Sequence, residues 1–422
     1  MRIAVWHNLP SGGGKRSLFY HARGLAERGH TIETWSPQSA DDTYLPLKEF
    51  AVEHKIPLDW EMSQVTSAYK KFIRSQRYVP SKLIAMREHC MRCAEEINRG
   101  GFDLLYAQPC WYMACTHIAQ YVKMPKIIYL QEPYRMLYEM PKLPWVGNAP
   151  FASKPFTPGR LKERLARYRA DVSVYDFRDQ VREEIENAKA FDKILVNSYF
   201  SRESVVRAYG INSKVCYLGI DTDLFVNKSF SREPYAVGLG SFSGSKNVKF
   251  IVEAFATIPE PRPKLVWVGN FTTFGYLEEA KELALKLKVD FEPRFRVTDE
   301  ELIEIMNRGS VMVYAPKLEP FGFAPLEASS CGLPVVAVAE GGVRETIIDG
   351  VNGLVVPLNA NAFGEAVAKL IADPALARKL GENGSKICKE KWNLEASLDR
   401  LEESFEETFA ELNLSYPPKS IK

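Results

Sequence analysis

With 422 residues, the chain is longer than a single hydrophobic core usually organises, so two domains are expected. A hydrophobic content of 46% and a charged content of 26% are ordinary for a soluble globular protein, and a net charge of +2 excludes the strong basic excess of a typical nucleic-acid-binding protein. Seven cysteines, an odd number spread along a long chain, argue against a disulfide framework.

The sequence predicts no targeting or membrane-spanning segment. Residues 1–7 turn polar too soon for a signal peptide. The apolar run at 333–339 has the length of a strand and is too short to cross a bilayer. We therefore expect a cytoplasmic protein, with at most a peripheral contact to the inner face of a membrane.

The first half of the chain begins with the pattern of a β-loop-α-β unit. Its strand, loop, helix and second strand are predicted at 3–6, 10–14, 17–28 and 31–35. Such a unit implies parallel strands joined by a right-handed crossover. Further strands are expected at 104–106, 127–130 and 194–196.

The same pattern restarts after Pro234. Strands are expected at 235–239, 265–268, 311–314, 334–338 and 353–356. Helices are expected at 248–256, 276–287, 300–307, 362–372, 374–381 and 394–412. Two successive α/β units predict two Rossmann-like domains with parallel sheets, which bind ligands at the carboxyl ends of their strands. We place the domains at 1–228 and 229–393, followed by a helical segment at 394–422.

The segment 319–328, Glu-Pro-Phe-Gly-Phe-Ala-Pro-Leu-Glu-Ala, combines two carboxylates with the start of a helix. Gly322 allows the backbone to approach a ligand closely, and the amides at a helix start favour an anionic oxygen or a sugar hydroxyl. Glu327 falls in the first turns of that helix. An acidic residue that only complements the helix dipole would explain Glu327 but not Glu319 and its neighbours. The combination therefore suits a polyhydroxylated, anionic ligand.

This segment resembles the E-x7-E region of glycosyltransferase family 4. Segments similar to other characteristic blocks of that family follow in order along nearly the whole chain, at 196–201, 209–211, 218–225, 341–350 and 352–356. The resemblance implies the GT-B fold, in which two Rossmann-like domains with parallel sheets face each other across a cleft. It also implies that the final helical segment, 394–422, packs back toward the first domain.

The function that this resemblance implies is a retaining glycosyltransferase, an enzyme of the kind used in polysaccharide biosynthesis. It would move a hexose-type sugar from a nucleotide-diphosphate sugar, UDP- or GDP-linked, to a hydroxyl of a glycan, lipid-linked or small-molecule acceptor. No cofactor and no metal is expected. Cationic side chains and amides must then stabilise the leaving diphosphate.

The resemblance also assigns roles to residues of the donor site. Glu319 would bind hydroxyls of the donor sugar, and Glu327 would bind the ribose. The backbone of the intervening loop and helix start would hold the sugar, at Phe321, Gly322, Phe323 and Ala324. The other residues assigned to the donor are Gly13, Gly14, Arg16, Ser241, Lys246, Arg296 and Val297.

Two departures from the family pattern affect the phosphate and acceptor groups. The family places an arginine and a lysine after the first strand of the second domain; Lys246 matches the lysine, but Ser241 stands where the arginine is expected. This change removes a bidentate phosphate ligand, for which Arg16, Arg294 or Arg296 would have to substitute.

Many members also carry a first-domain histidine near the donor sugar, at places that correspond here to Gln108 and Gln131. A glutamine can hydrogen-bond a hydroxyl but cannot take a proton. Glu132 is therefore a candidate base for the acceptor, and a structural or surface carboxylate is the alternative. The predicted catalytic residues are thus Glu319, Lys246 and Glu132.

The glycine-rich loop at 12–16 lacks the residues of a Walker A loop and of a GxGxxG fingerprint. It resembles the family's glycine-rich loop, which faces the diphosphate and the acceptor; a plain β-to-α turn is the alternative. Cys90 and Cys93 form a CxxC beside His89, and a zinc site is conceivable, but the sequence favours buried reduced thiols because a compact second ligand pair is missing.

Basic and aromatic residues alternate in two stretches, at 70–82 and 142–169. Members that act on lipid-linked acceptors dock such faces on anionic membranes. A solvated helix face is the alternative, because Glu139 and Glu163 dilute the charge.

Three other functions remain open. The missing arginine and histidine motivate a non-catalytic sugar-nucleotide-binding protein of the GT-B fold. A GT-B epimerase would use the same donor. A nicotinamide-dependent oxidoreductase would require a dinucleotide fingerprint, which both strand-loop-helix starts lack.

Overall fold

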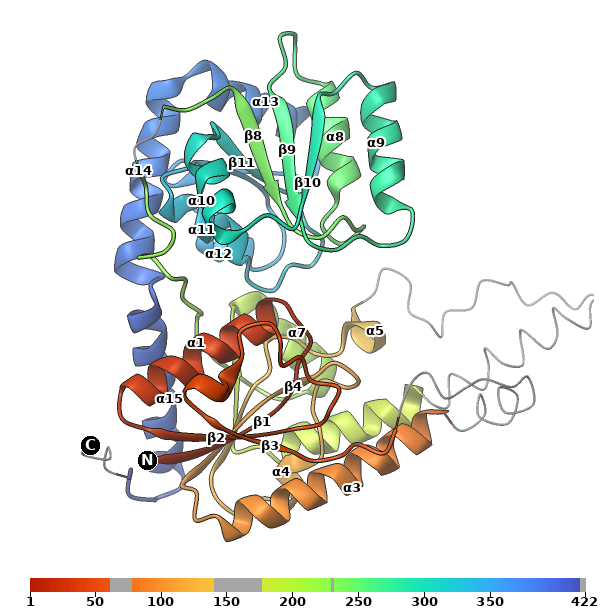
Figure 1. Cartoon of the computed structure of the whole chain (residues 1–422), viewed down its shortest axis with the longest axis vertical. Coiled ribbons are helices and arrows are strands. Elements are labelled where there is room, and N and C mark those ends of the chain that lie inside the picture. The colour runs from red at the N-terminus through yellow and green to blue at the C-terminus, as the bar shows by residue number, and fades with distance from the viewer. Residues whose placement is uncertain (61–77, 140–176, 229–230, 418–422) are drawn as a thin grey trace, which may run out of the picture. The chain divides into compact units, whose positions relative to one another are not determined.

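The computed structural model describes residues 1–60, 78–139, 177–228 and 231–417. The chain divides into two compact units, drawn in Figure 1. Unit 1 contains Met1–Val196, Ser201–Cys216 and Leu401–Lys422, and unit 2 contains Asn197–Phe200 and Tyr217–Arg400. Each unit is built on a fully parallel sheet, as the alternation of strand and helix predicts.

The sheet of unit 1 has the strand order β3-β2-β1-β4-β5-β6-β7. Its strands are β1 (Arg2–Asn8), β2 (Thr31–Ser36), β3 (Val52–Lys55), β4 (Leu104–Cys110), β5 (Lys126–Tyr129), β6 (Lys193–Val196) and β7 (Lys214–Val215). Its helices are α1 (Gly13–Glu27), α3 (Tyr78–Arg99), α4 (Ile118–Tyr121), α5 (Arg135–Tyr138), most of α7 (Tyr199–Tyr209) and a helix at 177–189, and a 3-10 turn spans Leu47–Glu49. All of β1 except its first residue is buried, as expected for a central parallel strand.

The sheet of unit 2 has the order β10-β9-β8-β11-β12-β13. Its strands are β8 (Tyr235–Leu239), β9 (Lys264–Gly269), β10 (Phe291–Phe295), β11 (Val311–Tyr314), β12 (Val335–Val338) and β13 (Gly353–Val356). Its helices are α8 (Val248–Ala256), α9 (Tyr276–Lys286), α10 (Asp299–Arg308), α11 (Phe323–Ser330), α12 (Val343–Thr346), α13 (Ala360–Ala372) and α14 (Pro374–Lys391). Helices α8 and α13 pack on one face through a core that includes Phe255 and Phe363.

Both sheets reverse their winding direction at the first strand of the unit. In unit 2, β8 lies between β9 and β11, and in unit 1, β1 lies between β2 and β4. The loops that follow the two strands at such a reversal diverge to opposite faces, which leaves a crevice where ligands bind. Ligand-binding residues are therefore expected in the loops after β8 and β11, and in those after β1 and β4.

The strands expected from the sequence form, but three further strands were not predicted. They are β3, β7 and β10, which all lie at sheet edges. Edge strands are half exposed and lack a continuous apolar run, and β10 contains Pro293, which an edge position tolerates.

The last helix, α15 (Leu394–Glu411), contributes its residues from Leu401 onward to unit 1. Phe405 is fully buried, and its ring centroid lies 5.5 Å from that of Tyr106 on β4. Glu402 accepts hydrogen bonds from Arg28 at 2.5 Å and bonds His30 at 2.9 Å. A chain segment far from β1 in sequence thus completes the core of unit 1.

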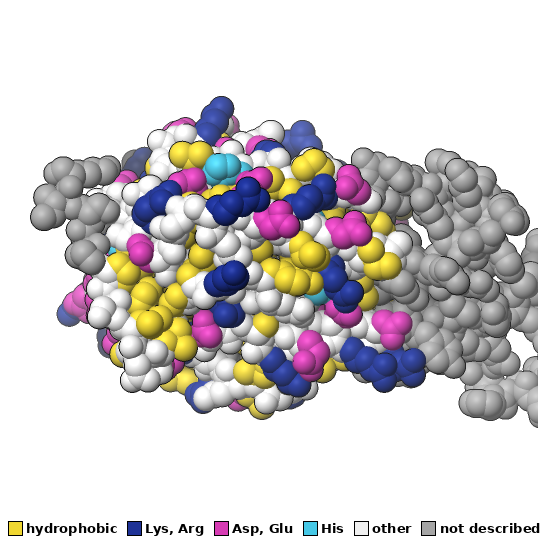
Figure 2. Space-filling model, turned by 90° about the horizontal axis from the view of Figure 1, so that it is seen from below, with side chains coloured by type: hydrophobic (Ala, Val, Ile, Leu, Met, Phe, Trp, Pro, Cys, Tyr) yellow, Lys and Arg dark blue, Asp and Glu magenta, His cyan; other side chains and the backbone are white. Residues whose placement is uncertain are grey.

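Surface charges of both signs are mixed. On the face that Figure 2 shows, lysine and arginine side chains alternate with aspartate and glutamate over the described residues. The predicted basic and aromatic stretch at 142–169 lies outside the described residues, as does most of the stretch at 70–82. No helix in the described part of the chain is long and apolar enough to span a membrane.

We expect the substitution Phe405→Ala to lower the free energy of unfolding of unit 1 by about 3–5 kcal/mol, because it leaves a cavity beside Tyr106. Phe274→Ala is the matched control, since Phe274 is fully exposed and its loss should change stability by less than about 0.5 kcal/mol. Urea unfolding of both variants measures this difference. Equal stabilities would show that the end of α15 does not belong to the core of unit 1.

Candidate functional site

The loop after β8 holds Lys246 against a glycine. Gly240 has a φ of +145°, and a Cβ placed there would lie 3.0 Å from Cγ of Lys246. The carbonyl of Gly240 accepts a hydrogen bond from Nε1 of Trp267 at 2.8 Å. The aliphatic stem of the lysine therefore lies across bare backbone that is fixed from the neighbouring strand.

Three serines of the same loop form a chain of hydroxyl groups. Ser241 and Ser243 lie 3.0 Å apart by their Oγ atoms, and Ser243 and Ser245 are separated by the same distance. Ser241, which replaces the arginine expected from the family, is thus part of a neutral array of donors and acceptors.

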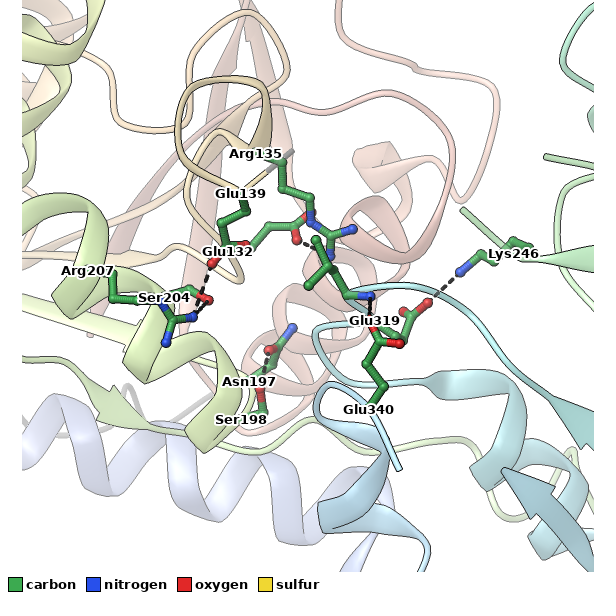
Figure 3. A network of polar contacts seen from close by, with 11 residues as sticks. Glu132, Arg135, Glu139, Asn197, Ser198, Ser204, Arg207, Lys246, Glu319 and Glu340 are labelled. Carbon is green, nitrogen blue, oxygen red and sulfur yellow. Dashed lines mark hydrogen bonds and ion pairs between the residues drawn. The ribbon is translucent and has the colours of Figure 1, made fainter. Parts of the chain in front are cut away.

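The loop after β11 brings Glu319 to Lys246. The Nζ atom of Lys246 lies 2.6 Å from Oε2 of Glu319. Figure 3 shows the two side chains pointing toward one another. The two loops are also joined through backbone, because the amide of Lys317 donates to the carbonyl of Ser245 at 2.8 Å. The pair forms because β8 and β11 are adjacent strands whose following loops leave the same edge of the sheet.

Backbone contacts from the segment after β12 hold Glu319 in place. The amide of Gly342 donates to the carbonyl of Glu319 at 2.8 Å. A Cβ at Gly341 would lie 2.3 Å from that carbonyl oxygen, and a Cβ at Gly342 would lie 2.0 Å from the carbonyl oxygen of Pro320. Only glycines permit this approach of two backbones, which gives a physical reason for the glycine pair in the 341–350 block.

Glu340 is a site residue that the sequence analysis missed. Its Oε1 accepts the amide hydrogen of Leu318 at 3.0 Å, and Leu318 has a left-handed φ of 53°. A left-handed leucine is unfavourable by itself, so the carboxylate of Glu340 stabilises the turn that presents Glu319 (Figure 3). Nothing local in the sequence marks this long-range contact.

The helix α11 begins directly beyond this turn. Gly322, with φ 91°, precedes its first residue and has no side chain that could cap the helix. Phe321 is buried, with its ring centroid 5.8 Å from that of Trp392. The amides at the start of a helix favour an anionic or hydroxyl oxygen.

Glu327 lies in the second turn of α11 with only 1% of its surface exposed. Glu319 is more accessible, with 17% of its side chain exposed. The two carboxylates of the E-x7-E segment therefore occupy different environments on one loop and helix. Both lie close enough to Tyr314, at the end of β11, to affect its phenol. Burial raises the pKa of Tyr314 most, and the negative charges of Glu319 and Glu327 raise it further.

The end of β10 completes this edge of unit 2. Arg296 has a left-handed φ of 55°, and its amide donates to the carbonyl of Gly269 at the end of β9, at 3.1 Å. The Arg296 side chain is exposed, and Val297 packs on the core below. Arg294 instead donates to Glu292 at 2.7 Å. Of these two arginines, Arg296 is the one that the loop places beyond the strand end.

In unit 1, a pocket of about 380 Å³ opens at the carboxyl ends of β1, β4 and β5. It is lined by residues 9–14 of the glycine-rich loop, by Pro109, Cys110, Trp111 and Ala114, and by residues 130–136. Glu132 lines the pocket and forms an ion pair with Arg135. Figure 3 shows this pair.

The predicted residues Gly13 and Gly14 line the same pocket, and Gln131 packs on the glycine loop. A Cβ at Gly14 would lie 3.4 Å from Nε2 of Gln131, whose φ is 61°. Gln108 is buried, and neither side-chain amide atom has a hydrogen-bond partner among the described residues. Arg16 donates from Nε to the hydroxyl of Tyr44 at 3.3 Å.

The cysteines are buried and reduced. Burial raises the pKa of the Cys93 thiol to about 12 and that of Cys90 well above its usual value. In the described ranges, no group of three or more histidine, cysteine or acidic residues is arranged to hold a metal ion.

Unit 2 thus gathers most of the predicted donor residues at one sheet edge. Ser241, Lys246 and Glu319 are joined by contacts between adjacent loops, and the start of α11 and Glu327 follow directly. Gly13, Gly14, Arg16 and Glu132 belong to unit 1. Their roles toward the donor and the acceptor remain predictions.

The second half of the chain, which carries this site, is similar to known sequences. Residues 219–387 match the model of the glycosyl transferases group 1. The chain is 25% identical over 242 residues to Alpha-1,3/1,6-mannosyltransferase ALG2 of Dictyostelium discoideum, covering 48% of this chain and 58% of that protein. It is 29% identical over 218 residues to D-inositol 3-phosphate glycosyltransferase of Kribbella flavida, covering 46% and 51%. The chain spans about half the length of these curated relatives.

Solved structures resemble the whole fold. Sucrose-phosphate synthase of Thermosynechococcus elongatus superposes with a TM-score of 0.69 at 19% identity, over 97% of this chain and 99% of that one. Anabaena HepE, determined in complex with UDP, gives a TM-score of 0.66 at 16% identity, over 96% and 99%. The predicted fold class, GT-B with two parallel-sheet α/β domains, is confirmed.

We expect Gly342→Ala to lower the free energy of unfolding of unit 2 by about 1–3 kcal/mol, because the new methyl group would collide with the backbone that carries Glu319. Gly244→Ala is the control, since a Cβ there meets only Tyr276, at 4.0 Å. Denaturant unfolding compares the two variants. If both have the stability of the parent, the close packing of 341–342 on 319–320 is wrong.

Proposed function

We propose that this chain, whose residues 219–387 belong to the glycosyl transferases group 1 family, is a retaining glycosyltransferase that uses a nucleotide-diphosphate sugar. The observation that carries the proposal is the Lys246–Glu319 pair at the strand reversal of unit 2, beside the start of α11. A cation for phosphate, a carboxylate for sugar hydroxyls and amides for an anionic oxygen would then lie together.

The ion pair suggests how the donor would be received. Lys246 and Glu319 neutralise one another, with 27% and 17% of their side chains exposed. A diphosphate would compete for Lys246, and the carboxylate of Glu319 would then accept hydrogen bonds from the sugar. Glu327, buried one helical turn further on, would accept from the ribose hydroxyls.

In the transfer step, the bond between the anomeric carbon and the diphosphate oxygen breaks, and the acceptor oxygen bonds the anomeric carbon on the same face. The proton of the acceptor hydroxyl passes to Glu132, the proposed base, and the electron pair of the broken bond leaves with the diphosphate, where negative charge develops. In the proposal, Lys246, the backbone amides and the hydroxyls of Ser241 and Ser243 stabilise that charge. Neither a metal nor another cofactor is part of it.

We assign the acceptor to the pocket of unit 1. The pocket combines apolar and aromatic walls with one oriented carboxylate, because Arg135 fixes Glu132 at its rim. A hydroxyl of a glycan, a lipid-linked sugar or a small sugar phosphate would bind there, with Glu132 as the proposed base. For a lipid-linked acceptor, a peripheral contact of a cytoplasmic protein with the inner membrane face would use the basic stretches.

We expect Glu319→Ala to reduce the rate of sugar transfer by about 10²-fold, since it removes a contact made at the reacting sugar. Glu327→Ala should weaken donor binding by about tenfold or more through the loss of hydrogen bonds to a charged group. Glu365→Ala, on the exposed side of α13, is the matched control and should leave both values unchanged.

The assay combines UDP-, GDP- and ADP-sugars, chosen by thermal shift, with an acceptor panel of methyl mannoside, D-inositol 3-phosphate and a hexose phosphate. Transfer at the same background rate in the parent and in Glu319→Ala would contradict the enzyme and favour a sugar-nucleotide-binding protein. A sugar nucleotide of altered stereochemistry, formed without acceptor, would indicate an epimerase.

Lys246→Met should remove the preference of the protein for a nucleoside diphosphate over the corresponding nucleoside, a loss of about tenfold for one charge-assisted contact. Lys249→Met is the control, because Lys249 pairs with Glu279 on the exposed side of α8. Calorimetric titration with both ligands gives the ratio. An unchanged preference in Lys246→Met would assign the diphosphate to another group.

A further inference from the structure

A buried polar network lies behind one wall of the unit 1 pocket. The wall is the segment 110–115, whose Trp111 and Ala114 line the pocket. Lys82 of α3, 6% exposed, reaches this segment from behind. Its Nζ donates to the carbonyl of Tyr112 at 3.0 Å and to Oε1 of Gln180 at 2.7 Å.

The helix at 177–189 presents a polar face to the same segment. Gln180, Glu184 and Asn187 are spaced so that they share one face of the helix, and none is more than 1% exposed. Nε2 of Gln180 donates to Oε1 of Glu184 at 2.8 Å, and Asn187 donates to the carbonyl of Cys115 at 3.0 Å. One buried helix face therefore follows the wall along its length.

The network also reaches a second lining segment of the pocket, at 130–136. The hydroxyl of Tyr209 on α7 donates to Oε2 of Glu184 at 3.0 Å. The ring of Tyr209 packs edge-on against that of Tyr138, with centroids 5.5 Å apart. Tyr138 ends α5, the short helix whose Arg135 and Met136 line the pocket. Both walls are thus attached to Glu184 through a few directional contacts.

An apolar core would stabilise this part of the fold without the free-energy cost of burying polar groups. A lysine and a carboxyl group lose their hydration when buried, and they are tolerated only if their hydrogen bonds are satisfied. A satisfied buried network holds its members in one arrangement, which an apolar contact does not. The placement of this network behind Trp111, 43% exposed, indicates that the position of the wall matters.

We propose that Lys82 and Glu184 are positioning residues that fix the pocket wall carrying Trp111 and thereby set the affinity for the acceptor. The effect on acceptor affinity rests on the proposed function, whereas the positioning of the wall does not. Neither side chain lines the pocket, so both act through the segment 110–115. The exposed ring of Trp111 is the surface that a sugar ring would pack against.

Glu184 has a further consequence for pH dependence. Burial raises its pKa to about 7, against the opposing effect of its hydrogen bonds and of Lys82. The groups that face it from the other elements are Lys82, Tyr209, Tyr138 and Cys115. Because the folded state holds this proton more tightly than the unfolded state, its contribution to stability is present below about pH 4.5 and is lost as the pH rises through 7.

The first test compares Lys82→Met, which keeps the volume but removes the donors, with Lys82→Arg, which keeps donors. Lys189→Met, on the exposed side of the helix at 177–189, is the matched control. In Lys82→Met we expect amide hydrogen exchange at 111–116 to accelerate about tenfold, with β1 and β4 unchanged, because a buried donor has been removed. The KM for the fastest acceptor of the panel should rise about tenfold while the donor KM stays constant. In Lys82→Arg, the exchange rate at 111–116 and the acceptor KM should both return most of the way to the values of the parent.

Unchanged exchange at 111–116 in Lys82→Met would overturn the inference whatever the acceptor panel gives. Faster exchange with an unchanged acceptor KM would overturn it as well, since the wall would then not affect the acceptor. If no acceptor of the panel reacts with the parent protein, the proposed function fails, and hydrogen exchange alone decides whether Lys82 positions the wall.

The second test uses Glu184→Gln, which is close to the same shape and does not titrate. Its stability relative to the parent should improve steadily between about pH 4.5 and 8, and the acceptor KM of the parent, but not of the variant, should change near pH 7. Identical pH profiles of the parent and Glu184→Gln would remove Glu184 from the positioning network.

Discussion

The candidate donor site depends on one constraint: β8 and β11 are neighbours in a parallel sheet although they are far apart in sequence. Their loops leave the sheet at the same edge, and so Lys246 and Glu319 meet at 2.6 Å. The pair is only partly exposed, and each charge compensates the other. A ligand that carries both negative charge and hydroxyl groups, as proposed, could satisfy both side chains.

The position of Glu319 depends on contacts that leave no local signal in the sequence. The E-x7-E spacing and the flanking glycines could be found by inspection, because they lie within one loop and one helix. The carboxylate of Glu340 and the close packing of Gly341 and Gly342 come from the segment after β12. Such contacts depend on the tertiary fold. Glu319 could therefore be predicted from the sequence, but the residues that hold it in place could not.

The fold itself was predictable where strands are central and apolar, as in the runs that became β1, β8 and β12. The edge strands β3, β7 and β10 were missed, since edge strands are half exposed and β10 contains a proline. The burial of one face of the helix at 177–189 could not be predicted from the sequence either. Its Arg, Lys and Glu content indicates an exposed helix, yet Gln180 and Glu184 on one face are buried and hydrogen-bonded.

The two units differ in how their sites are supported. In unit 2, glycine backbone and the Lys246–Glu319 ion pair hold the candidate site, and the neighbouring core is apolar. In unit 1, a pocket with an aromatic rim is supported by buried polar side chains. Backbone contacts keep Glu319 rigid, whereas a hydrogen-bonded network can change with protonation. This difference is consistent with the roles proposed for the two units, donor binding in unit 2 and acceptor binding in unit 1.

The most direct test of the account is hydrogen exchange of the full chain with UDP-glucose and, in parallel, GDP-mannose. We expect the nucleotide sugar that binds to protect the amides of 240–246, 295–297 and 316–327, with the strongest effect at the start of α11. Binding that leaves 316–327 unprotected would contradict the central claim, because the Lys246–Glu319 pair and the helix start would then not be the donor site.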